Sequence, residues 1–165
     1  MYRNGHLGMS LLVYAPVGYL LVGRRPLLAV LGGVVVLSLA SVPDIDHRLP
    51  VVSHRGVTHS LLFAAGVGAV GWAAGTVLGG LGIAPVDLAG TTLSPALFLG
   101  FLGVYGILAH LAGDVITPAG VPLFWPAPTT LSLSVVGADS TVANYGLLAA
   151  GVVATGAALA VGVPG

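Results

Sequence analysis

The chain has 165 residues, of which 56% are hydrophobic and 6% are charged, and its formal net charge is zero. So few charges cannot cover the surface of a water-soluble domain, and the five arginines are too scattered to form the basic stripe of a nucleic-acid-binding protein. The absence of cysteine excludes disulfides and thiolate ligands, so any bound metal must be held by histidine nitrogens and carboxylate oxygens.

Apolar runs long enough to span the hydrocarbon core of a bilayer recur along the chain. They predict five transmembrane helices, over residues 6–23, 27–42, 59–83, 95–115 and 141–163. The first run ends in Arg24 and Arg25 and has no small-residue cleavage site, so we expect a retained helix and not a signal peptide. The expected fold is all-α, a single integral-membrane domain over residues 1–165.

Two further features concern the helix ends and contacts. Thr58 is the expected N-terminus of the third helix, and the glycines spaced four apart at 71–79 are interpreted as positions where helix backbones pack closely. Residues 117–140, after the fourth helix, contain Phe124, Trp125 and several prolines, which predicts a loop at the membrane interface.

The alternation of spans gathers the groups that could bind a metal on one face of the membrane. The first and third helices begin on the N-terminal face, and the second and fourth end there. This face receives all five histidines and four of the five aspartates, whereas Arg24, Arg25 and Asp87 lie on the opposite face. A polar metal site at one membrane face is therefore predicted.

Two pairs of residues supply candidate ligands. His110 and Asp114 are four apart on a predicted helix, so they lie one turn apart on one face and can reach the same ion. Asp44 and Asp46 follow Pro43, and an extended backbone would turn both carboxylates into one pocket, where their repulsion requires a cation. An aspartate near the hydrocarbon is costly unless it is paired or binds a metal.

The segment HRGVTHS at 54–60 is the most specific string in the chain. It contains His54 and His59 as candidate ligands. It also places Arg55 beside a helix start, where a phosphate or carboxylate would bind. His6, at the start of the first helix, is a further candidate ligand.

Simpler interpretations of these residues stay open. His6 could equally be an interfacial histidine, and His47 could be an alternative ligand or a group that orients one. Arg48 and Arg55 could pair with the aspartates in a solvated loop without any metal.

Together these motifs resemble the membrane-bound metal-dependent hydrolases, also described as LexA-binding, inner-membrane-associated hydrolases. The resemblance spans most of the chain, through His6, PDIDH at 43–47, HRGVTHS at 54–60, HLAGD at 110–114 and TPAGVPLFWP at 117–126. It implies a small multi-helix protein of the prokaryotic inner membrane with metal-dependent hydrolase activity, while the partner LexA has no counterpart in the residue pattern.

A second likeness concerns the substrate. The order of histidines and aspartates ending in H-x-x-x-D is similar to that of the zinc-dependent phospholipases C and nucleases, which implies phosphate-ester substrates. The chain departs from that pattern because it has no glutamate and no histidine after Asp114, which argues against a three-zinc site.

The resulting hypothesis is a metal-dependent hydrolase, with a phosphoesterase favoured. One or two divalent ions, most simply zinc, would lower the pKa of a bound water. Arginines would bind the anionic group of the substrate, and an aspartate that does not bind the metal would be the general base. The predicted metal ligands are His6, Asp44, Asp46, His54, His59, His110 and Asp114, and the predicted catalytic residues are Asp46, Arg48 and Arg55. The expected partners are membrane lipids and an amphiphilic or phosphate-containing small molecule.

Two other classes of function are kept. A proton- or metal-coupled transporter would carry polar groups through the depth of the bilayer, and the predicted helix interiors are nearly free of them. A non-catalytic scaffold would use the histidine cluster only for stability. The orientation of the protein in the membrane stays open, because in the positive-inside count Arg24 and Arg25 favour one face and Arg3, Arg48 and Arg55 favour the other. The identity of the metal and the oligomeric state also stay open.

Overall fold

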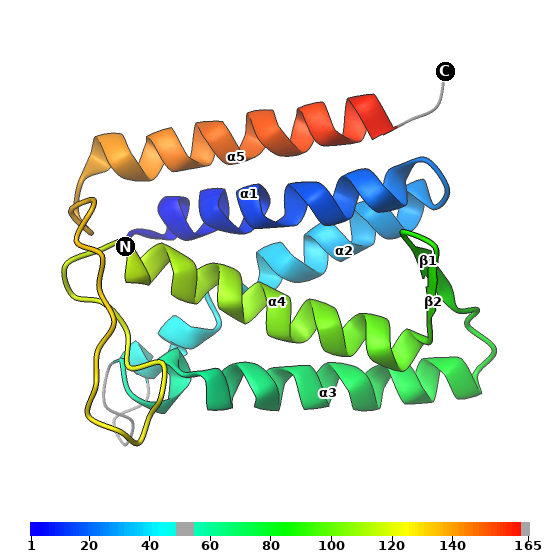
Figure 1. Ribbon diagram of the computed structural model, residues 1–165, viewed down its shortest axis with the longest axis horizontal. Helices are drawn as coiled ribbons and strands as arrows, with labels where there is room; N and C mark the ends of the chain where they lie inside the picture. Colours follow the sequence, from blue (N-terminus) through cyan, green and yellow to red (C-terminus); the bar gives the residue numbers. More distant parts are fainter. Residues whose placement is uncertain (49–54, 163–165) are drawn as a thin grey trace.

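The protein consists of five long helices that run along one another (Figure 1). The computed structural model describes residues 1–48, the side chain of Arg48 excepted, and residues 55–162. The helices are α1 (Arg3–Val22), α2 (Pro26–Leu39), α3 (Leu61–Gly80), α4 (Pro95–Val115) and α5 (Thr141–Gly162). All five are long and apolar enough to cross a membrane, α2 when extended to His47, which confirms the predicted all-α membrane fold.

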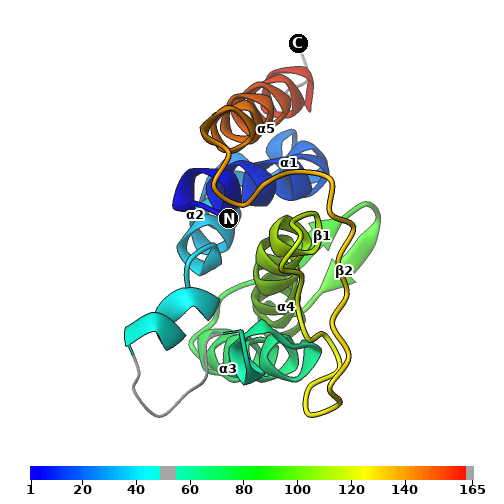
Figure 2. The same cartoon turned by 90° about the vertical axis from the view of Figure 1, so that its left-hand side faces the viewer.

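The helices are arranged as two pairs joined by α2. Helix α1 packs along α5, α3 packs along α4, and α2 contacts both α1 and α4. Viewed along the bundle, α5 and α3 lie on opposite outer sides (Figure 2). The core between the pairs is apolar and includes Tyr14, Leu21, Val36 and Leu102.

Glycines make the close helix contacts that the sequence predicts. A Cβ atom on Gly71 would meet the backbone of Leu99, and one on Gly75 would meet the backbone of Pro95, so α3 can lie against α4 only with glycine at these positions. Gly8 and Gly151 have the same role between α1 and α5.

Two short helical turns close the end of the bundle at which the first helix begins, here called the site end. Turn η1 (Pro43–Arg48) follows α2, and turn η2 (Val57–His59) precedes α3. The N-cap of α3 is Ser60, whose Oγ accepts a hydrogen bond from the Phe63 N–H at 3.2 Å. The expectation that Thr58 begins this helix was wrong, because the Thr58 hydroxyl donates to Asp46 instead.

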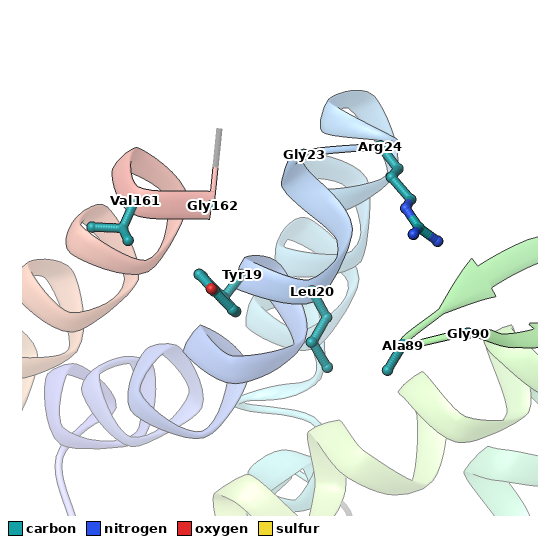
Figure 3. Close-up of a pocket in the computed structure, with 8 residues that line it drawn as sticks. All are labelled: Tyr19, Leu20, Gly23, Arg24, Ala89, Gly90, Val161 and Gly162. Atoms are coloured by element: carbon teal, nitrogen blue, oxygen red, sulfur yellow. The ribbon is translucent and has the colours of Figure 1, made fainter. Parts of the chain in front are cut away.

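The opposite end carries a small hairpin that the sequence analysis did not predict. Strand β1 (Val86–Leu88) pairs antiparallel with β2 (Thr91–Leu93), and Asp87 accepts hydrogen bonds from Arg24 Nη1 at 2.6 Å and from the Gly90 N–H at 3.1 Å. A pocket of about 430 Å³ lies here between the hairpin, α1 and α5 (Figure 3). Its lining contains Arg24 but no histidine or carboxylate among the described residues.

The segment between α4 and α5 lies at the site end, as Figure 1 shows. Val121 pairs with Leu131, and the Leu133 N–H donates to the Val115 carbonyl, so this loop folds back on the end of α4. Phe124 and Trp125 are exposed, as expected of aromatic side chains at a membrane interface.

Candidate metal centre

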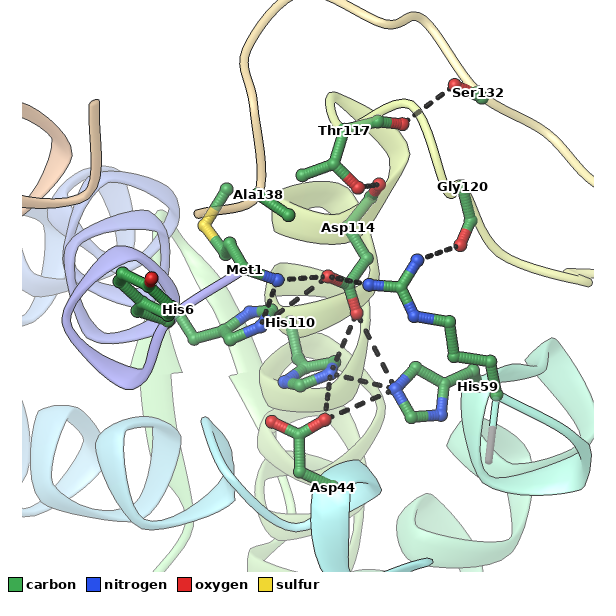
Figure 4. A network of polar contacts seen from close by, with 12 residues as sticks. Met1, His6, Asp44, His59, His110, Asp114, Thr117, Gly120, Ser132 and Ala138 are labelled. Atoms are coloured by element: carbon green, nitrogen blue, oxygen red, sulfur yellow. Dashed lines mark hydrogen bonds and ion pairs between the residues drawn. The ribbon is translucent and has the colours of Figure 1, made fainter. Parts of the chain in front are cut away.

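Four side chains from three segments meet at the site end (Figure 4). Asp44 comes from η1, His59 from η2, and His110 and Asp114 from the last turns of α4. Helix α4 places the last two on one face because they are four residues apart. The turns η1 and η2 bring the other two against that face.

Five separations among the four ligand atoms match those of a tetrahedral metal site, and all four atoms lie within 4.8 Å of one another. His59 Nε2 lies 3.4 Å from Asp44 Oδ1 and 3.5 Å from Asp114 Oδ2. His110 Nε2 lies 3.8 Å and 3.3 Å from the same two oxygens, and the two Nε2 atoms are 3.4 Å apart. Ligands about 2.1 Å from a tetrahedral zinc ion lie about 3.4 Å from one another. Residues 44, 59, 110 and 114 therefore form a cluster of the right size to hold such an ion.

Hydrogen bonds outside the cluster orient both imidazoles. His110 Nδ1 donates to the Ala40 carbonyl at 2.7 Å, which leaves the lone pair on Nε2, the atom that faces the cluster. His59 Nδ1 lies 3.0 Å from Thr58 Oγ1 and 3.4 Å from Asp46 Oδ2. The Thr58 hydroxyl donates to Asp46 Oδ2 at 2.9 Å, so this hydroxyl can accept from His59 Nδ1 and turn Nε2 inward.

The cluster is buried on one side and accessible on the other. His59, His110 and Asp114 have side chains exposed by 1% or less, whereas Asp44 is 31% exposed. Two carboxylates held this close together repel each other and are costly to bury without a cation. Because Asp44 is the partly exposed member of the four, the cluster is reached from outside the protein past this residue.

The two carboxylate oxygens of Asp114 have different contacts: one faces the cluster, and the other contacts nearby cations. Its Oδ2 faces the histidines, while its Oδ1 accepts from Arg55 Nη2 at 3.3 Å and lies 2.7 Å from the Met1 nitrogen. Arg55 Nη1 also donates to the Gly120 carbonyl at 2.9 Å. The guanidinium thus holds both the carboxylate and the loop that follows α4.

His6 and Asp46 lie beside the four-residue cluster. The His6 ring stacks on His110, with centroids 3.8 Å apart, and its Nε2 lies 3.6 Å from the outer oxygen of Asp114. Its Nδ1 is buried and has no hydrogen-bond partner in the described part of the chain. Asp46 is placed on the Nδ1 side of His59, and together with Asp44 and His47 it forms a second group whose atoms could also hold an ion.

Two predicted residues cannot be placed. His54 and the side chain of Arg48 lie outside the described residues. Conversely, sequence reasoning missed the contributions of Thr58 and the Ala40 carbonyl. Thr58 is next to His59 in the HRGVTHS motif, so the sequence could have indicated it. The contact of the Ala40 carbonyl with His110 depends on helix packing and cannot be predicted from a sequence pattern.

The fold and the site define a class: a helical membrane protein with a buried His/Asp cluster that could hold a metal ion. The chain belongs to the YdjM inner membrane protein family, whose model matches residues 1–163. This confirms the resemblance to the membrane-bound metal-dependent hydrolases and the inner-membrane location. No curated protein and no solved structure matches the chain.

Proposed function

We propose that this protein is a metal-dependent hydrolase that cleaves phosphate esters of amphiphilic or lipid-linked substrates at the membrane boundary. The main support is the tetrahedral spacing of two histidine nitrogens and two carboxylate oxygens, whose nearest separations are 3.3 to 3.8 Å. Such a donor set suits zinc among the common divalent ions. A bound ion of this kind would lower the pKa of a coordinated water to about 7 and polarise the phosphoryl oxygen.

The four residues divide into three buried ligands and one accessible carboxylate. Catalytic zinc sites use three protein ligands and keep a fourth position for water or substrate. His59, His110 and Asp114 fit the first role because they are buried and held by hydrogen bonds. Asp44 is the partly exposed member of the four, so in this proposal its carboxylate gives up the fourth position to water and substrate and remains beside it.

Asp44 is therefore the proposed general base, in place of Asp46. Asp46 already accepts from the Thr58 hydroxyl and the Arg55 N–H, both at 2.9 Å. In the proposed reaction Asp44 takes a proton from the attacking water. The water oxygen bonds to phosphorus, the ester P–O bond breaks, and the departing alcohol oxygen takes up the proton that Asp44 accepted.

Two pockets that border Asp44 support an amphiphilic substrate. The larger, about 590 Å³, is lined by apolar Leu37 and Ile45 and by Arg3. The guanidinium of Arg3 makes no ion pair with any described residue, so it is available to an anionic group. The smaller pocket, about 220 Å³, includes Arg55, which provides a second cation beside the same carboxylate.

The test is to combine metal analysis with a turnover assay on the detergent-purified protein. We expect stoichiometric zinc or another divalent metal by plasma mass spectrometry, and metal-dependent release of phosphate or alcohol from lipid phosphate esters. Bound metal without hydrolysis, but with ion flux in proteoliposomes, would favour the transporter. Metal that affects only thermal stability would favour the scaffold, and no metal even after reconstitution would exclude the mechanism.

A further inference from the structure

A second cavity lies inside the membrane-spanning part of the protein, away from the metal centre. It has a volume of about 520 Å³, within the range of small-molecule sites, and lies between α2, α4 and the C-terminal end of α3. Apart from one arginine, its lining consists of apolar side chains and glycine, among them Leu28, Leu31 and Val35 of α2 and Phe98 and Leu102 of α4. We call this cavity the apolar groove.

The depth of the apolar groove matches that of a lipid chain. Its lining on α2 extends from Arg25 to Val35, a rise of about 15 Å along a helix, which is about half the hydrocarbon thickness of a bilayer. Val34 and Leu31 line it and are 55% and 47% exposed, so the groove opens toward the surrounding lipid. Water does not fill apolar cavities of this kind readily, whereas an acyl chain can enter from the side.

Arg25, a cation without an ion-pair partner among the described residues, lies at the mouth of the apolar groove. Arg24 is paired with Asp87 at 2.6 Å, whereas the guanidinium of the neighbouring Arg25 makes no hydrogen bond or ion pair with any described residue. Arg25 directly precedes the first residue of α2, at the end of the candidate span, where lipid headgroups begin. Its positive charge complements a phosphate at the same depth.

We infer that the apolar groove binds one acyl chain of an anionic phospholipid, whose phosphate pairs with Arg25. The groove lies at the end of the bundle opposite to the metal centre, so this lipid is distinct from any substrate cleaved at Asp44. The bound chain would contact α2, α4 and the C-terminal end of α3, whose side chains line the groove.

The experiment measures lipid retained by the purified full-length protein. Protein in detergent is incubated with phosphatidylglycerol or with phosphatidylcholine of the same acyl chains, and bound lipid is counted by native mass spectrometry. For the wild type we expect phosphatidylglycerol to be retained about fivefold more than phosphatidylcholine, since one arginine near the headgroups contributes an effect of about this size. Arg25→Gln should lose this preference, and Arg25→Lys should keep part of it.

A second pair of variants tests the groove itself. Val34→Trp should fill it and reduce retention of both lipids, whereas Val153→Trp, on the exposed surface of α5, should leave retention unchanged. Equal retention of the two lipids by the wild type, or an unaltered preference in Arg25→Gln, would overturn the inference. A wild-type dimer that Val34→Trp converts to a monomer would also overturn it, because a second copy would then occupy the groove. If Val34→Trp fails to fold, the Arg25 variants decide alone.

Discussion

The Nε2 atoms of His59 and His110 lie 3.4 Å apart, although the two residues are 51 positions apart in the sequence. Because His110 donates from Nδ1 to the Ala40 carbonyl, its Nε2 carries a lone pair that points toward His59. Two carboxylate oxygens face the same space. Lone pairs that converge in this way repel one another unless a proton or a cation lies between them, which is the physical basis of the following predictions.

Metal content should depend on the buried ligands. We expect His110→Ala and Asp114→Ala to lose the metal found in the wild type, since each removes one atom of the tetrahedral set. Plasma mass spectrometry on protein of matched folding measures this. Asp87→Ala is the control, because this carboxylate pairs with Arg24 at the opposite end. Equal loss of metal in the control would point to nonspecific binding.

Asp46→Asn should weaken metal binding without abolishing it. Asp46 Oδ2 lies 3.4 Å from Nδ1 of His59, the ring nitrogen that does not face the cluster, so it acts on the orientation of the imidazole. Loss of such a supporting group reduces metal affinity about 10- to 100-fold. Competition with a chelator measures the affinity. A variant that binds no metal at saturating concentration would instead identify Asp46 as a direct ligand.

Asp44→Asn should separate catalysis from metal binding. The three buried ligands remain, so we expect metal to be retained, while kcat for a lipid phosphate ester falls about 100-fold or more through loss of the base. Parallel metal analysis and turnover measurements test this. Wild-type turnover in the variant would exclude Asp44 as the base.

Metal should stabilise the fold, and this stabilisation should decline in acid. Zinc at 100 times its Kd is expected to add about 2.7 kcal/mol to the free energy of unfolding. Protons compete with metal for the imidazole lone pairs and carboxylate oxygens, so lowering the pH weakens binding and removes the stabilisation. Thermal unfolding with and without chelator across a pH series measures it, and a metal effect that grows toward low pH would contradict this site.

Gly75→Ala should destabilise the contact between α3 and α4. The added Cβ would meet the backbone of Pro95 and Ala96, which cannot move aside as a flexible side chain could. We expect a loss of about 1 to 3 kcal/mol. Gly66→Ala on the same helix is the matched control, because a Cβ there meets nothing within 4 Å. Equal Tm values for the two variants would show that this contact does not depend on glycine.

Much of the architecture follows from the sequence alone. Apolar runs of bilayer length give the five helices, and their alternation places His110 and Asp114 at the same membrane face as Asp44 and His59. The absence of cysteine and glutamate limits the donors to histidine and aspartate. These features are local or depend only on counting spans, so no knowledge of tertiary contacts is needed.

The tertiary structure alone decided the separate positions of Asp44 and Asp46. The sequence analysis allowed an extended backbone that turned both carboxylates into one pocket, but residues 43–48 form a 3₁₀ turn. With about three residues per turn, side chains two apart point in different directions, so Asp44 meets Nε2 of His59 and Asp46 lies on its Nδ1 side. One oxygen of each carboxylate still lies within 4.8 Å of the other, in the group that includes His47. The contacts of Ala40 and Thr58 likewise depend on segments packed together from distant parts of the chain. A local pattern shows which residues can bind a metal, whereas packing determines which of their atoms face it.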